Sequence, residues 1–202
     1  MKSGVIVAGG RSTRFGDADK AVAELAGVPM IRRVADRLAG VVDALVVNCR
    51  EGQVDAVREA MAGYDRPVRY AVDDEPDRGP MAGIRNGLRA VPHDYAFVAA
   101  CDMPFLDSDF VAYLFDRAAG HDAAVPRLDG WFEPTHAVYH ADAMADACDA
   151  ALERGASRIV APLENLKYVV VDEDEVDAHA DRATFENVNT REEFEAAAER
   201  LA

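Results

Sequence analysis

The chain has 202 residues, half of them hydrophobic, and a formal net charge of −15 at pH 7. A chain of this length and composition can bury a full core in one domain spanning residues 1–202. Its negative charge excludes duplex DNA and anionic membranes as general electrostatic partners, because both attract surfaces rich in Lys and Arg. We therefore expect neither a nucleic acid nor a membrane among its partners.

Short β-branched runs alternate along the chain with segments of helical periodicity. Strands are predicted at residues 4–8, 44–48, 68–72, 96–100, 123–125, 137–139 and 168–171. Helices are predicted at residues 30–38, 53–61, 81–91, 109–119, 141–153 and 190–201. This alternation is typical of βαβ units. It predicts an α/β fold, a three-layer αβα arrangement with a mostly parallel, Rossmann-like sheet.

Local signals refine this pattern. Thr190 and Glu193 form a capping-box signature at the start of the last helix. Asp129 and Gly130 predict a hairpin turn between two short strands. The acidic stretch 172–177 is predicted to be solvated surface.

The balance of charged residues is unusual. The 37 acidic residues face 22 basic ones, of which only Lys2, Lys20 and Lys167 are lysines. Strongly hydrated carboxylates with few lysines are typical of surfaces exposed to very high salt, where screening removes the repulsion between like charges. The composition therefore indicates a halophilic source. It also singles out Lys20 as a retained compact positive charge.

The sequence does not indicate secretion or a covalent framework. Residues 4–8 are too short for a signal-peptide core, and no hydrophobic run approaches the length of a membrane span, which predicts a cytoplasmic protein. The cysteines, Cys49, Cys101 and Cys148, are odd in number and widely spaced. We expect free buried thiols rather than disulfides or a zinc site.

The first predicted strand leads into a glycine-rich loop that carries basic residues. The segment from Ala8 to Lys20 includes Gly9, Gly10 and Arg14. Ligands of α/β sheets bind at the carboxyl ends of strands, and glycines allow the backbone to approach a phosphate chain closely. The loop fits neither the P-loop pattern nor G-x-G-x-x-G. Basic residues in so acidic a chain nevertheless indicate a phosphate-binding loop.

Asp102 directly follows the predicted strand 96–100. Asp107 or Ser108 is better placed to cap the next helix, which leaves Asp102 available for function. A carboxylate at the carboxyl edge of the sheet, opposite the glycine-rich loop, is suited to bind Mg²⁺ that bridges triphosphate oxygens. We therefore predict that Asp102 is a metal ligand.

Asn48, Asp73 and Asp74 also follow predicted strands, so we expect them along the same edge. An asparagine amide can read a base or ribose, and a carboxylate can accept hydrogen bonds from ribose hydroxyls or purine N–H groups. Turn formation would explain these residues equally well. Residues 79–83 predict a tight entry to a helix whose backbone N–H groups could face a nucleotide.

These segments together resemble the molybdenum cofactor guanylyltransferase (MobA) family. The resemblance rests on Val7-Ala8-Gly9-Gly10 with Arg14, Gly16 and Lys20, on Gly79-Pro80-Met81-Ala82-Gly83, on Cys101-Asp102-Met103-Pro104, and on Glu186-Asn187-Val188-Asn189-Thr190. It spans residues 4–191. Many nucleotidyltransferases share the opening motif, whereas Asn48, the Pro134-Thr135 segment and the 187–190 motif are more specific.

The resemblance implies a nucleotidyltransferase sheet and Mg²⁺-dependent transfer of GMP from GTP to molybdenum-bound molybdopterin, with release of pyrophosphate. Molybdoenzyme assembly proteins are implied as further partners. By residue, the resemblance places Val7, Ala8, Gly9, Gly10 and Asn48 at the nucleotide, Lys20 at its phosphates, Asp73 or Asp74 near the ribose or base, Asp102 on Mg²⁺, Arg14 and Asp17 near the reacting phosphates, and Asn187 and Asn189 on the pterin side.

Two other functions are compatible with the sequence. One is nucleotidyl transfer from CTP, or to another phosphorylated acceptor. The other is a carrier that binds nucleotide and molybdopterin without turnover, although such a carrier has no need of Asp102 at a metal. No Ser/His/Asp arrangement supplies a protein nucleophile. His136 and His140, near Pro134-Thr135, are candidates for contact with the acceptor.

Overall fold

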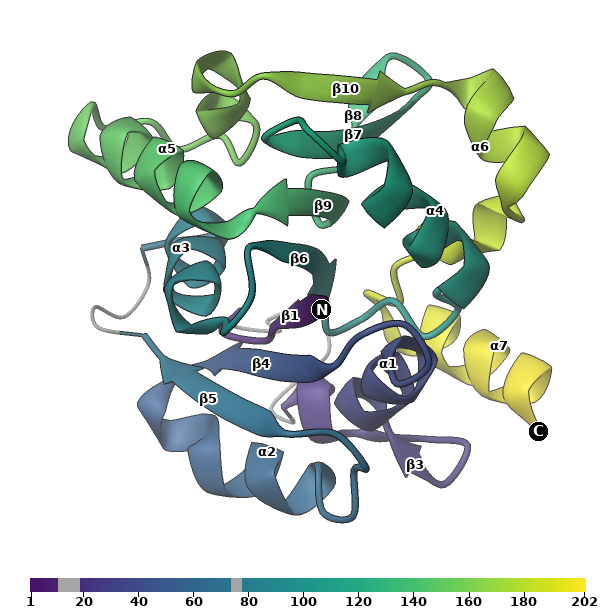
Figure 1. The fold of residues 1–202 in the computed structure, drawn as a ribbon. Helices are drawn as coiled ribbons and strands as arrows, with labels where there is room; N and C mark the ends of the chain where they lie inside the picture. The colour runs from purple at the N-terminus through teal and green to yellow at the C-terminus, as the bar shows by residue number, and fades with distance from the viewer. Residues whose placement is uncertain (11–18, 74–77) are drawn as a thin grey trace.

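The computed structural model describes residues 1–10, 19–73 and 78–202. Its main sheet has the strand order β10-β7-β9-β6-β1-β4-β5 (Figure 1). These strands are β1 (Ser3–Val7), β4 (Ala44–Cys49), β5 (Val68–Val72), β6 (Tyr95–Ala100), β7 (Ala123–Leu128), β9 (His136–His140) and β10 (Tyr168–Val171). Strand β1 pairs in parallel with β4 and β6, β4 with β5, and β10 with β7, whereas β9 is antiparallel to both neighbours. The predicted mostly parallel sheet is confirmed.

Helices cover both faces of the sheet (Figure 1). One face packs against α1 (Met30–Leu38), α2 (Val54–Ala60), α4 (Ser108–Ala118) and α6 (Glu173–His179), and the other against α3 (Pro80–Ala90) and α5 (Ala141–Glu153). Four 3₁₀ helices are present among the described residues, η1 (Lys20–Val22), η2 (Glu51–Gln53), η3 (Ala161–Asn165) and η4 (Arg182–Phe185). The predicted three-layer αβα arrangement is confirmed.

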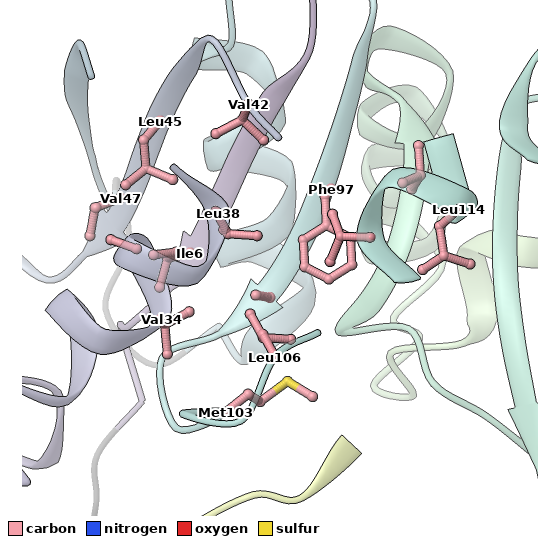
Figure 2. Packing of buried hydrophobic residues seen from close by; sticks show 14 of the residues in the cluster. Ile6, Val34, Leu38, Val42, Leu45, Val47, Phe97, Met103, Leu106 and Leu114 are labelled. Carbon is pink, nitrogen blue, oxygen red and sulfur yellow. The ribbon is translucent and has the colours of Figure 1, made fainter. Parts of the chain in front are cut away.

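Alternate residues of the central strands face opposite layers, as the pleat of a strand requires. Ile6 of β1 packs with Val34 and Leu38 of α1, and Figure 2 shows these side chains close together. The neighbouring residue, Val5, points to the other face and packs with Ile84 of α3. All five side chains are fully buried. Burial on both faces explains why these strands read as continuous hydrophobic runs.

Helix α3 approaches β1 closely because it carries glycines on its inner side. A Cβ atom on Gly87 would lie 2.4 Å from Cγ1 of Val5. No real side chain can be accommodated at that distance unless the helix or the strand moves. The glycine therefore sets the distance between this turn of the helix and the strand.

Two hairpins project from this framework. Strand β8 (Trp131–Phe132) pairs with β7, and the turn residues Asp129 and Gly130 have φ of 49° and 80°. This pair of positive φ angles is the signature of the predicted two-residue hairpin turn. A second hairpin joins β2 (Glu24–Leu25) to β3 (Val28–Pro29) and was not predicted. Its strands have only two residues each, too few to show a hydrophobic period.

The structure adds detail to two predicted segments. The predicted helix 53–61 is divided into η2 and α2. The acidic stretch from residue 172, predicted as solvated surface, forms the helix α6. Asp172 caps it by accepting a hydrogen bond from the Glu175 backbone N–H. Three acidic residues in the first turn interact favourably with the positive end of the helix dipole. The stretch is helical and still largely exposed.

The last helix, α7 (Arg191–Leu201), begins with the predicted capping box of Thr190 and Glu193. Its Ala197 packs with Leu25 and Val188 in a small separate cluster. The segment before α7 returns to the residues after β6, where the Val188 N–H donates to the Asp102 carbonyl oxygen. No helix in the described part of the chain is long and apolar enough to span a membrane.

Candidate active site

The carboxyl ends of four parallel strands meet at one edge of the sheet. Val7 at the end of β1 lies opposite both Asn48 of β4 and Ala100 of β6, and Asn48 lies opposite Ala71 of β5. The residues that follow these strands, Gly9, Asp73 and Asp102, therefore share this edge. The structure confirms the predicted placement of all of them.

Lys20 lies at the centre of a charged cluster at this edge. Its Nζ atom donates to Oδ2 of Asp102 at 2.6 Å and to Oδ1 of Asn189 at 3.1 Å. The residue is only 5% exposed, so its ammonium group is largely removed from water and is stabilised by these two partners. Three segments meet here, since Lys20 belongs to η1, Asp102 follows β6 and Asn189 precedes α7.

Asp102 retains an unused oxygen atom. While Oδ2 accepts from Lys20, the buried Oδ1 atom has no hydrogen-bond partner among the described residues. The backbone of Asp102 is fixed by its carbonyl oxygen, which accepts from the Val188 N–H at 2.9 Å. A buried carboxylate oxygen without a donor is unfavourable unless a ligand uses it.

The described residues offer few other ligands for a metal. In the described ranges 1–10, 19–73 and 78–202, no group of three or more His, Cys, Asp and Glu side chains could hold a metal ion. Such a sparse ligand set fits Mg²⁺, which commonly takes one or two protein carboxylates and completes its shell with water and substrate phosphates.

A second polar cluster lies at the same edge of the sheet, around Asn48. Its Nδ2 atom donates to the Ala71 carbonyl oxygen at 3.0 Å and to Oδ1 of Asp73 at 2.7 Å. Because both partners are acceptors, the orientation of the Asn48 amide is assigned, and its Oδ1 atom is free to accept a hydrogen bond. That atom is buried and has no partner within the described residues. Asn48 and Asp73 therefore present acceptor oxygens toward the edge of the sheet.

Two glycines border these acceptors. A Cβ atom on Gly83 of α3 would lie 2.4 Å from Oδ1 of Asn48, and one on Gly9 would lie 2.6 Å from Oδ2 of Asp73. Any side chain at either position would press on an acceptor oxygen. The absence of side chains there preserves the position of both oxygens and the space beside them.

The structure adds residues that the sequence did not single out. Gln53, buried at the end of η2, lies beside Ala8 and Asp19. The Nδ2 atom of Asn86, on α3, lies 3.5 Å from Oδ1 of Asp73. Neither residue belongs to the segments on which the resemblance to the MobA family rests. The signal that could have found Gln53 is compositional, since it is the only glutamine in the chain.

Other predicted residues have different outcomes. Arg14, Asp17 and Asp74 lie outside the described residues, so their roles stay predictions. Gly10 is exposed and its α-carbon faces open space. Asn187 is exposed, and its Nδ2 atom donates to the Phe185 carbonyl oxygen at 3.3 Å. Unlike Asn187, Asn189 reaches the lysine of the site.

The histidines do not contact this edge as proposed. His136 is fully buried among Phe97, Phe110 and Phe185, and burial lowers its pKa to about 3. His140 accepts from the Ala143 backbone N–H at 3.5 Å and caps α5. The expectation that these residues approach an acceptor is wrong, because His136 is part of the core and His140 lies opposite Tyr95, at the end of β6 away from Asp102.

The cysteines are free, as predicted. Burial raises the pKa of the Cys49 thiol to about 11 and the pKa values of Cys101 and Cys148 to about 12. Thiols with such pKa values stay protonated near neutral pH and are poor nucleophiles. The cysteines thus give the site no thiolate for covalent catalysis.

Comparison with known proteins places this geometry in a family. Residues 4–180 match the model of the MobA-like NTP transferase domain. The chain belongs to this family. A relative from the halophilic archaeon Natronomonas pharaonis, described as a "probable molybdenum cofactor guanylyltransferase", is 52% identical over 100% of this chain and 98% of the relative. A molybdenum cofactor guanylyltransferase from Desulfosudis oleivorans is 34% identical over 96% of this chain and 93% of its own length.

Solved structures agree with this assignment. Molybdopterin-guanine dinucleotide biosynthesis protein A from Archaeoglobus fulgidus superposes with a TM-score of 0.80 at 27% identity, covering 100% of this chain and 98% of that chain. A nucleotidyl transferase from Methanothermobacter has a TM-score of 0.73 at 21% identity over 100% of this chain and 97% of its own, which shows the shared fold. The chain is thus a nucleotidyltransferase of the MobA-like family.

Proposed function

We propose that this protein transfers GMP from GTP to molybdenum-bound molybdopterin, forming molybdopterin guanine dinucleotide and releasing pyrophosphate. The names of its full-length relatives support this activity. The observation that carries it is the pair of clusters at one sheet edge. The acceptor oxygens of Asn48 and Asp73 lie at the same edge of the sheet as the buried Lys20 and Asp102, which suits a base and a phosphate chain bound side by side.

The acceptor oxygens of Asn48 and Asp73 favour guanine over cytosine as the bound base. Guanine presents adjacent donors on one edge, its N1–H and its 2-amino group, which match a pair of acceptor oxygens such as those of Asn48 and Asp73. Cytosine presents one donor beside two acceptors, so one oxygen of the protein would face an acceptor. Leaving a buried acceptor without a donor costs about 1–3 kcal/mol, enough to discriminate between the two bases.

Lys20 supplies the positive charge that the phosphates require. Its ammonium group is already desolvated, and a charge-assisted hydrogen bond to a phosphate oxygen is roughly twice as strong as a neutral one. The acceptor's terminal phosphate attacks the α-phosphorus of the nucleotide in line, and pyrophosphate leaves. Both reactants are anions, so catalysis consists mainly of holding them together and offsetting the charge of the transition state.

The reaction is proposed to depend on Mg²⁺, with Oδ1 of Asp102 as its protein ligand. When bound, the ion would offset negative charge on the phosphates. Asn189 holds Lys20 beside Asp102 and so keeps both charges at the same point of the site. We further propose that the reaction takes place in the cytoplasm and that the product passes to assembly proteins of molybdoenzymes.

The proposal is tested by following pyrophosphate release with a panel of substrates. GTP, CTP and ATP are each combined with Mg²⁺ and with molybdenum-bound molybdopterin or a sugar 1-phosphate. We expect release only with GTP and the molybdopterin acceptor. Release with CTP or with the sugar phosphate would assign a different transferase activity. Tight binding of both substrates without release would instead support a carrier.

A further inference from the structure

Gln53, at the end of η2, uses its whole side chain for hydrogen bonds. Its Nε2 atom donates to the Ala8 carbonyl oxygen at 3.3 Å and to Oδ2 of Asp19 at 2.5 Å. Its Oε1 atom accepts from the backbone N–H of Arg50 at 3.1 Å and from the Nε atom of the same residue at 3.0 Å. Because both Arg50 groups are donors and the other two partners are acceptors, the orientation of the amide is fixed. The residue is 4% exposed.

The two acceptors flank the glycine-rich segment. Ala8 directly follows β1, and Asp19 directly precedes Lys20. A single side-chain nitrogen therefore joins residues on either side of this segment. Since Gln53 itself is anchored by the backbone of residue 50, both flanks are fastened to the stretch that follows β4.

The link continues to the charged cluster. The second oxygen of Asp19, Oδ1, accepts from the Ala21 backbone N–H at 3.1 Å and caps η1. This 3₁₀ helix has only three residues, too few to be stable without external contacts. Its position consequently depends on contacts with the rest of the chain, which include this cap and the burial of Ala21 in the core. The first residue of the helix is Lys20.

We propose that Gln53 is a positioning residue that holds the Lys20 ammonium group at Asp102. It acts through Asp19 and η1, since its hydrogen bonds among the described residues go to Ala8, Asp19 and Arg50 and not to Lys20, Asp102 or Asn189. The consequence for GTP binding rests on the proposed function, in which Lys20 binds the nucleotide phosphates. The position of Lys20 in the free protein does not depend on that function.

The test uses a reversal of one hydrogen bond. Gln53→Glu keeps the size of the side chain and the acceptor for Arg50, but it loses both donors and sets a carboxylate against Asp19. In the double variant Asp19→Asn/Gln53→Glu, the new amide can donate to the new carboxylate, while the Oδ1 cap of η1 is retained. The matched control is Asp181→Asn, because Asp181 caps η4 in the same way, accepting from the Ala183 N–H at 2.8 Å.

The first readout is the side-chain NMR signal of Lys20 in the free protein. The chain has only three lysines, so the three ammonium signals can be resolved and Lys20 assigned by Lys20→Arg. We expect Gln53→Glu to shift this signal toward that of the exposed Lys167, the double variant to restore it, and Asp181→Asn to leave it unchanged. If the single variant does not fold, Asp19→Asn alone tests the same link, because it sets two donors face to face.

The second readout is the dissociation constant for GTP and for guanosine. Gln53→Glu should weaken GTP binding about tenfold or more and leave guanosine binding unchanged. GTP binding should recover in the double variant. An unchanged Lys20 signal in a folded single variant, or no recovery in a folded double variant, would overturn the positioning role. A shifted Lys20 signal with unchanged GTP binding would uphold the positioning of Lys20 and overturn its proposed role at the phosphates.

Discussion

Gly83→Ala should damage base recognition while leaving most of the fold intact. The added Cβ atom would lie 2.4 Å from Oδ1 of Asn48 and 3.1 Å from Cγ1 of Val7. Both neighbours are well packed, so Asn48 must move away from the position in which its oxygen is proposed to accept from the base. Losing a hydrogen bond to a buried acceptor costs about 1–3 kcal/mol, which corresponds to a roughly 5- to 150-fold weaker binding of GTP.

The effect on stability should be modest. Replacing a helical glycine with alanine stabilises a protein by roughly 0.5–1 kcal/mol, whereas overpacking costs about 1–3 kcal/mol. The net loss should therefore be at most about 2.5 kcal/mol. Gly87→Ala is the matched control, because Gly87 lies on the same helix. Its added Cβ atom would lie at the same distance, 2.4 Å, from a different neighbour, Cγ1 of Val5.

The assay combines denaturant unfolding with calorimetric titration of GTP and CTP. Both variants should lose stability, but only Gly83→Ala should lower the ratio of GTP affinity to CTP affinity. The reasoning would be refuted if folded Gly83→Ala kept the wild-type ratio. It would also be refuted if Gly87→Ala lowered the ratio equally, because the effect would then arise from helix displacement in general.

Three further predictions concern charge. Lys20→Ala should weaken GTP binding by about 1.5–3 kcal/mol and guanosine binding hardly at all, and equal losses in titrations of both ligands would remove Lys20 from the phosphates. Burial lowers the pKa of His136 from 6.5 to about 3. As the pH falls, the unfolded chain therefore binds a proton at this histidine before the folded protein does. The stability present above pH 6.5 is lost progressively as the pH falls toward 3. Between pH 7 and pH 4 the wild type should lose about 3 kcal/mol more than His136→Leu in urea unfolding, and parallel pH profiles would contradict this. The melting temperature should rise from about 0.05 to 3 M KCl, because screening reduces the repulsion among the acidic side chains, and a flat or falling curve in circular dichroism would refute the halophilic interpretation.

The position of the site could be predicted from the sequence because its signals are local. Each buried strand is a hydrophobic run, and the polar residue after it necessarily lies at the carboxyl edge of a parallel sheet. Asn48, Asp73 and Asp102 were found in this way. The capping box of Thr190 and the turn at Gly130 were likewise evident from short patterns.

The rest depends on contacts between distant segments, which no local pattern reveals. The contact of Asn189 with Lys20 joins residues 169 positions apart, and that of Gln53 with Asp19 joins residues 34 positions apart. His136 was misjudged because its sequence neighbours are polar or small, whereas its burial results from aromatic residues of β6, α4 and η4. For α6, acidic composition obscured helix formation, although Asp172 was a capping signal.

The central claim is tested most directly by competition between nucleotides in one reaction. The protein is incubated in molar KCl with Mg²⁺, molybdenum-bound molybdopterin and equal concentrations of GTP and CTP, and the dinucleotide products and pyrophosphate are quantified by mass spectrometry and enzymatic assay. We predict the guanine dinucleotide in excess, one pyrophosphate for each dinucleotide formed, and loss of both products in folded Asp102→Asn. A predominance of the cytosine dinucleotide, or full activity of Asp102→Asn, would contradict the account.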